Sequence, residues 1–258
     1  MELPVFSLIQ VQDFLICAAR VATLMGVLPV FSGGQVPNKV RVGLALTFAL
    51  LIFPVVTTFL PARILGLWEL ALLVSKEAIL GLMVGFVARL IFTAVEFAGT
   101  VVGFQMGFAA ANVFDPQNQH QISLLGEFEN IIAILIFLAL NIHYLFLRAI
   151  VYSYKILPPG KLDFSGGAVP FLMNLAGHMF VLSVKFSAPI LAVLLISSLA
   201  LGLMARVFPQ LNVFLLSYPL NIGLAFLIIG VTLDVLVVML GREFHAMGEQ
   251  FIHLLRVL

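Results

Sequence analysis

The 258-residue chain is 62% hydrophobic and only 10% charged, whereas ordinary soluble domains have about 45–50% apolar and about 25% charged residues. So few charges cannot cover so much apolar surface in water, which excludes a soluble globular protein and predicts an integral membrane protein. The formal net charge of +1 and the lack of a basic cluster argue against nucleic acid as a partner. The one cysteine, Cys17, provides no disulfide framework.

Apolar runs near the length of a bilayer crossing follow one another along the chain. We expect them at residues 11–30, 42–60, 67–95, 97–114, 131–147, 186–205 and 211–233, with a further run that starts near residue 171. Pro54 should kink or break the second run. Residues 152–170 contain several prolines and glycines and predict a connection outside the membrane.

Glycines recur at four-residue intervals in the middle of the chain. They are Gly81 and Gly85, followed by Gly99, Gly103 and Gly107. At this spacing they share one face of a helix, where the missing Cβ atoms let another backbone approach closely. This pattern is also typical of ordinary transmembrane packing.

The glycine-rich helix is expected to end at or just before Asp115, because Pro116 biases that residue away from the α conformation. The segment that follows, residues 117–123, is polar but carries no fixed charge. The pattern therefore predicts a tightly packed helix that leads into a polar loop.

The C-terminal part predicts a hairpin followed by an amphipathic helix. Residues 206–210 are all that separate two long uncharged runs, which is short enough for a tight antiparallel connection. From Gly241 onward, apolar residues recur at helical spacing, and charged residues and histidines occupy most of the other positions. The apolar residues are Phe244, Met247, Phe251, Leu254 and Leu258.

Nine charged residues lie within or beside the apolar runs. They are Asp13, Arg20, Lys76, Glu77, Arg89, Glu96, Lys185, Arg206 and Asp234. A charge at the centre of a bilayer costs about 2.5–3.5 kcal/mol on insertion scales. Some of these side chains can reach the interface from helix ends, and the others must face protein or water.

Signatures of catalysis are missing from the sequence. Gly160-Lys161 lacks the preceding glycine and the following Ser or Thr of a phosphate-binding loop. The five histidines show no paired metal-ligand spacing, and no carboxylates pair for acid–base work. We expect no enzyme activity, no cofactor and no metal.

The residues alone leave two functions open. One is a secondary transporter whose broken helices line a polar site in the middle of the membrane, which Pro54, Pro209 and the intramembrane charges favour. The other is a non-enzymatic channel or assembly subunit, which the glycine spacing, the uncharged loop and the many charges in need of partners favour.

Two stretches resemble the FliR family of the flagellar type III export gate and its injectisome relatives. The first is Gly103-Phe104-Gln105-Met106-Gly107-Phe108, followed by Asp115-Pro116. The second runs from Arg206 through Pro209 and Gln210 to Asn212, with Tyr218-Pro219-Leu220 behind it. Weaker matches at residues 37–41, 141–143 and 157–158 extend the resemblance over nearly the whole chain.

The resemblance implies an all-α, polytopic membrane protein of bent helical hairpins within a multi-subunit helical assembly. It implies one domain over residues 1–258, in which residues 1–180 are similar to a FliP-type subunit. Residues 181–258 would be similar to a FliQ-type hairpin with an amphipathic end.

The resemblance also implies partners and a place in the cell. The expected partners are FliP-type and FliQ-type subunits, an FlhB-type switch protein, an FlhA-type export component and unfolded protein substrates. The expected place is the bacterial inner membrane, in the flagellar basal body.

In this family a loop after the glycine-rich helix plugs the pore. The matching residues here are Phe108, Ala109, Ala110, Ala111, Asn112, Val113, Phe114, Asp115 and Pro116. The expected helix-packing residues are Gly99, Gly103 and Gly107, and the expected hairpin contacts with other subunits are Arg206, Pro209 and Gln210.

Overall fold

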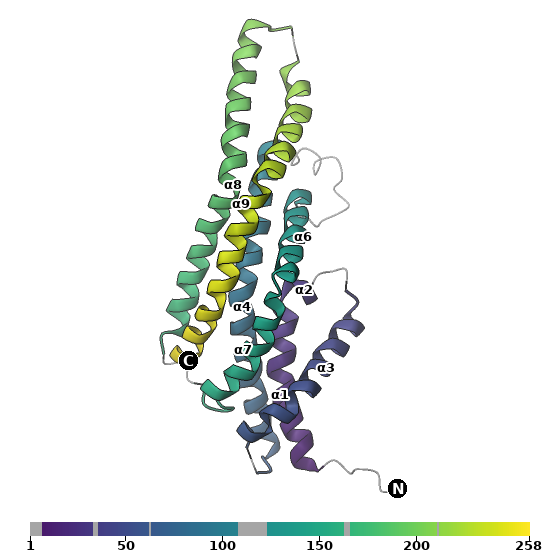
Figure 1. Cartoon of the computed structure of the whole chain (residues 1–258), viewed down its shortest axis with the longest axis vertical. Coiled ribbons are helices and arrows are strands. Elements are labelled where there is room, and N and C mark those ends of the chain that lie inside the picture. Colours follow the sequence, from purple (N-terminus) through teal and green to yellow (C-terminus); the bar gives the residue numbers. More distant parts are fainter. Residues whose placement is uncertain (1–6, 33–35, 62, 108–122, 163–165, 211) are drawn as a thin grey trace. The chain divides into compact units, whose positions relative to one another are not determined.

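The structure is a computed structural model in which every regular element of the described residues is helical (Figure 1). It describes residues 7–32, 36–61, 63–107, 123–162, 166–210 and 212–258. The helices are α1 (Leu8–Val27), α2 (Pro29–Ser32), α3 (Asn38–Val56), η1 (Thr57–Phe59), α4 (Leu67–Met106), α6 (Leu124–Ala139), α7 (Ile142–Ile156), α8 (Ala168–Val207) and α9 (Val213–Val257). The all-α class is therefore confirmed.

Five of these helices are long and apolar enough to cross a membrane. They are α1, α3 extended by η1, α4, α8 and α9, and α6 with α7 adds a sixth if the pair is one broken span. This confirms a polytopic membrane protein. Pro54 lies in the last turn of α3, just before the backbone tightens into the 3₁₀ turn η1, as its position predicted.

The expected division of residues 67–114 into two helices is wrong. α4 is one helix of 40 residues that runs through Glu96. Glutamate is a good helix former, so a single acid in an apolar run does not end a helix. The helix also stops at Met106, well before Asp115, because Gly107 adopts a left-handed backbone with φ of +93°.

Two further boundaries differ from the prediction. The expected span at residues 131–147 is interrupted at Asn141, whose φ of +57° is left-handed and separates α6 from α7. The amphipathic C-terminal segment is the last part of α9 and not a separate helix, because the backbone stays helical through Gly241.

The chain forms two compact units. Unit 1 comprises residues 1–90, 138–175 and 244–258, and unit 2 comprises residues 91–137 and 176–243. The single domain over residues 1–258, its division near residue 180 and the likeness of each part to another subunit type stay predictions.

Close packing between α1 and α4 organises unit 1. A Cβ atom on Gly81 would lie 2.5 Å from the carbonyl oxygen of Arg20, and one on Gly85 would lie 3.1 Å from that of Leu24. These are the close backbone approaches expected of glycines four residues apart. On its other side α1 packs against α3, where Phe14 and Phe53 meet edge to face.

A buried ion pair lies at the centre of unit 1. Arg20 Nε donates to Glu77 Oε2 at 2.6 Å, and both side chains are 1% exposed. The same guanidinium donates to Ser153 Oγ at 2.9 Å and to the carbonyl oxygen of Leu157 at 3.1 Å, and it lies over the ring of Tyr154. Arg20 thereby joins α1, α4 and the end of α7.

Unit 2 is built on α4, α6 and the α8–α9 hairpin. Its core contains Val102, Met106, Leu125, Leu194 and Ala225, all of which are buried. Ser197 of α8 donates a 2.8 Å hydrogen bond to Asn221 of α9. Figure 1 shows these two helices side by side, as the short separation at residues 206–210 predicted.

We predict that Arg20→Met lowers the free energy of unfolding by about 3–5 kcal/mol, because it leaves the Glu77 carboxylate buried without its partner. The double variant Arg20→Met/Glu77→Leu should recover most of that loss. Equilibrium unfolding in detergent measures both.

The control for this prediction is Arg63→Met, which breaks the ion pair between Arg63 and Glu69. The Arg63 side chain is 70% exposed and the Glu69 side chain is 50% exposed. Exposed pairs contribute at most about 1 kcal/mol. Equal losses in Arg20→Met and Arg63→Met would contradict the structural role of the buried pair.

Candidate loop base and subunit-binding surface

The residue that precedes the predicted plug loop is tightly packed in unit 2. Met106, the last residue of α4, is fully buried, and Gly107 follows it in a left-handed conformation. A Cβ atom on Gly107 would lie 2.4 Å from the ring of Tyr218 on α9. Any other residue at 107 would therefore meet both an unfavourable backbone and a filled space.

Ser123, the first described residue after position 122, contacts α4. The Ser123 hydroxyl accepts a hydrogen bond from the backbone N–H of Gly126, which caps the start of α6, and it donates to the carbonyl oxygen of Gly99 at 3.4 Å. The same hydroxyl lies 3.1 Å from the position of a Cβ atom on Gly103.

Because Gly103 precedes Gly107 by about one helical turn, residues 107 and 123 both lie against the C-terminal end of α4. The residues on either side of positions 108–122 are therefore both packed against other parts of unit 2. The plug residues that we predict, Phe108 to Pro116, lie outside the described residues.

The predicted packing glycines have different neighbours. A Cβ atom on Gly99 would lie 2.7 Å from the Cα atom of Gly126, so the backbones of α4 and α6 approach closely there. At Gly103 the neighbours are the side chains of Ser123 and Leu125. Gly107 lies just beyond the helix and adjoins α9 instead.

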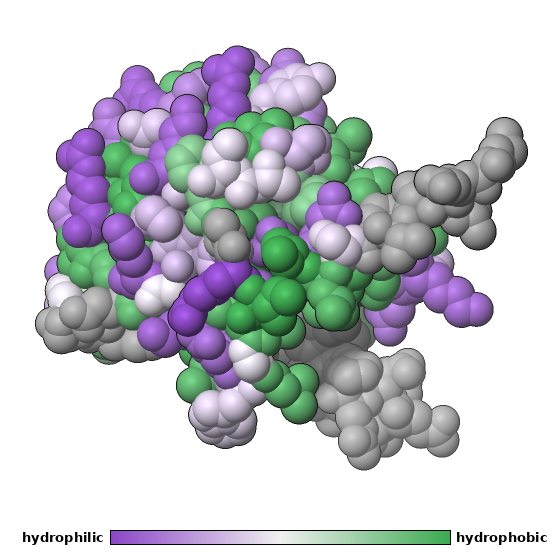
Figure 2. All heavy atoms as spheres, turned by 90° about the horizontal axis from the view of Figure 1, so that it is seen from below, coloured by the Kyte–Doolittle hydropathy of each residue, from purple (hydrophilic) through white to green (hydrophobic). Residues whose placement is uncertain are grey.

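The α8–α9 hairpin leaves much apolar surface open. Side chains that are more than half exposed include Leu195, Ile196, Leu199, Leu203, Leu215 and Val231. Arg206, Pro209 and Gln210 are all exposed at the connection between the two helices. In the face drawn in Figure 2, open hydrophobic side chains also adjoin hydrophilic ones.

Several charged side chains project from the apolar helices of unit 2. Glu96 on α4, Lys185 on α8 and Asp234 on α9 are exposed. An exposed charge inside an apolar run is unfavourable in lipid, so these positions favour contact with protein or water.

Sequence reasoning missed two parts of this arrangement. It marked Arg20 and Glu77 as charges in need of a partner, but a separation of 57 residues gives no sign that they pair. It also noted Tyr218 only as part of a motif. The four-residue spacing of the glycines predicted neither the contact between Arg20 and Glu77 nor the contact between Gly107 and Tyr218.

The fold and the hydropathy define a polytopic, all-helical membrane protein whose surfaces suit further protein contacts. Residues 11–247 match the family model described as bacterial export proteins, family 1.

Three relatives carry the name flagellar biosynthetic protein FliR. The Bacillus subtilis (strain 168) protein is 34% identical over 94% of both chains. The Pectobacterium carotovorum protein is 30% identical over 84% of this chain and 82% of its own. The Escherichia coli (strain K12) protein is 30% identical over 79% of this chain and 77% of its own. The chain belongs to the FliR family of bacterial export proteins.

We predict that Gly99→Ala lowers the free energy of unfolding by about 1–3 kcal/mol, the usual cost of overpacking, because the new methyl group meets the Gly126 backbone. Gly103→Ala should cost less, since the side chains next to it can move. Thermal unfolding of the purified chain in detergent ranks the two.

Gly202→Ala is the matched control, because Gly202 lies inside α8 with nothing within 4 Å of an added Cβ atom. It should be neutral, or stabilising by up to about 1 kcal/mol through helix propensity. A Gly99→Ala variant as stable as Gly202→Ala would contradict the close packing of α4 on α6.

Proposed function

We propose that this chain is a non-enzymatic channel subunit of the flagellar export gate, with residues 108–116 as a plug that passing polypeptide displaces. Membership of the FliR family makes it a component of the flagellar export apparatus. The proposal comprises the channel role, the plug and the location in the inner membrane and basal body. It also comprises the FliP-type, FliQ-type, FlhB-type and FlhA-type partners.

The observation that carries the plug is the close packing of the residues that flank it. Gly107 adjoins Tyr218 of α9, and Ser123 is hydrogen-bonded to Gly99 of α4, so the chain is held at both ends of residues 108–122. A stopper must keep its base fixed while its tip is displaced. The sequence of the tip suits this use, since residues 108–114 are uncharged and can exclude water and ions as hydrophobic constrictions do.

The long hairpin supports a place inside an assembly. α8 has 40 residues and α9 has 45, which at 1.5 Å per residue correspond to about 60 Å and about 68 Å of helix. A hydrocarbon core is only about 30 Å thick. Lipid alone therefore cannot cover the exposed apolar side chains along both helices, and FliP-type and FliQ-type subunits are the proposed cover.

The buried ion pair of unit 1 gives little support to the transporter alternative. Arg20 and Glu77 bond to each other, and the remaining Arg20 donors reach Ser153 and Leu157. A substrate site in the middle of the membrane needs polar groups that can turn to the substrate, and these groups are already engaged.

The test of the plug is the deletion of residues 109–114. We expect the complex to assemble and the membrane to become permeable to small ions, with slowed growth, because the base stays intact while the seal is lost. Membrane conductance and the yield of copurified subunits are measured on the same strain.

A matched deletion of residues 117–121 in the polar part of the loop is the control, and it should leave conductance low. An assembled complex with unchanged conductance after the 109–114 deletion would rule the plug out. Loss of assembly without a leak would assign these residues to packing.

We also predict that Arg206→Leu reduces copurification of FliP-type and FliQ-type subunits and impairs motility. The Arg206 side chain is exposed at the hairpin connection, so the unfolding temperature of the chain alone should not change. Lys161→Leu, at an exposed cation in another connection, should leave both properties as they are. Normal assembly and swimming of the Arg206→Leu strain would make Arg206 an ordinary interfacial residue.

A further inference from the structure

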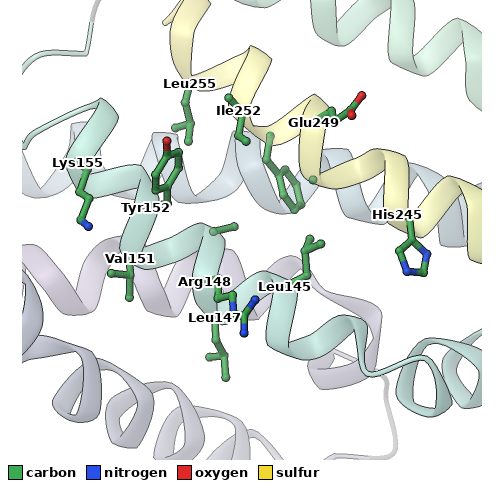
Figure 3. A pocket seen from close by; sticks show the side chains of 13 residues that line it. Leu145, Leu147, Arg148, Val151, Tyr152, Lys155, His245, Glu249, Ile252 and Leu255 are labelled. Atoms are coloured by element: carbon green, nitrogen blue, oxygen red, sulfur yellow. The ribbon is translucent and has the colours of Figure 1, made fainter.

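An apolar groove in unit 1 has no role in the proposed gate. It lies between α7 and the last part of α9 and has a volume of about 810 Å³. It is lined mainly by aliphatic and aromatic side chains, among them Leu145, Tyr152, Ile252 and Leu255 (Figure 3). Phe146 and Phe251 pack edge to face between the two helices. Ligand sites in proteins have about this size.

Two cations lie on one wall of the groove. Arg148 and Lys155 are seven residues apart on α7, with Tyr152 between them, so all three follow one side of the helix. The acidic residue of the groove, Glu249, lies on α9, and Figure 3 shows its carboxylate pointing away from α7. Among the described residues, Arg148 and Lys155 form no ion pair with it.

The character of α7 favours lipid as the occupant. This helix has only 15 residues, too few to cross a bilayer alone. Its exposed side carries Tyr144 and Tyr152, which are 58% and 47% exposed, together with the two cations. Tyrosines beside Lys and Arg are the residues that gather where membrane meets water.

We propose that this groove binds one anionic phospholipid. Its acyl chains fill the apolar space between α7 and α9, and its phosphate lies on the side of Arg148 and Lys155. Glu249 on the opposite wall disfavours a second negative charge there and so sets the orientation of the headgroup. An empty apolar groove of this size beside lipid would forfeit the contacts that acyl chains supply.

The test measures lipid adducts of the full chain by native mass spectrometry in mild detergent, with phosphatidylglycerol and phosphatidylcholine as probes. The wild-type chain should retain phosphatidylglycerol in preference. Arg148→Gln/Lys155→Gln should lower that preference about thirtyfold, since each cation near an anionic headgroup contributes about a factor of five. Glu249→Gln should raise it.

Two controls distinguish the contribution of the lipid headgroup to binding from that of the acyl chains. Lys39→Gln/Lys161→Gln removes two exposed cations outside the groove and should leave the preference unchanged. Ala149→Trp places a large side chain in the groove and should reduce retention of both lipids several-fold at an unchanged unfolding temperature. Inorganic phosphate should not displace the bound lipid.

Three results would overturn the proposal. One is an unchanged lipid preference in Arg148→Gln/Lys155→Gln. Another is full lipid retention in a folded Ala149→Trp chain. The third is a crosslink between Ile252→Cys and another subunit in membranes while the purified complex holds no lipid, which would assign the groove to protein.

Discussion

The ion pair between Arg20 and Glu77 is the contact on which unit 1 depends. A guanidinium and a carboxylate in the middle of apolar helices are tolerable only when each meets the other and the spare donors find oxygen atoms. Here those oxygen atoms belong to Ser153 and Leu157 at the end of α7. The pair therefore fixes α7 against α1 and α4, and the wall of the apolar groove is held with it.

Both units combine buried and exposed charges. Unit 1 buries the pair of Arg20 and Glu77 and exposes Arg89, whereas unit 2 buries Glu129 and exposes Glu96, Lys185 and Asp234. Apolar side chains are exposed in both units, at Leu50 and Trp68 in unit 1 and at Leu195 and Val231 in unit 2. The proposed assembly would cover this surface with lipid and with other subunits.

Composition and spacing predicted the membrane class, the hairpin and the close approaches at Gly81 and Gly85, because hydropathy and helical period are local properties. The continuity of α4 through Glu96 follows from helix propensity, and the predicted break gave too much weight to a single charge in the hydropathy pattern. The turn at Gly107 and the break at Asn141 depend on left-handed backbones that tertiary contacts select. The pairing of Arg20 with Glu77 joins residues far apart in sequence, and no local pattern encodes it.

The length of the hairpin has a consequence for how the protein is made. A newly inserted chain would expose helices about twice as long as a hydrocarbon core is thick, and it would have to tilt or distort the bilayer to cover them. That mismatch raises the free energy of the isolated chain in the bilayer, and we expect the isolated chain to be degraded faster than the assembled one. If other subunits cover these helices as proposed, synthesis of the chain is best matched in timing and amount to theirs.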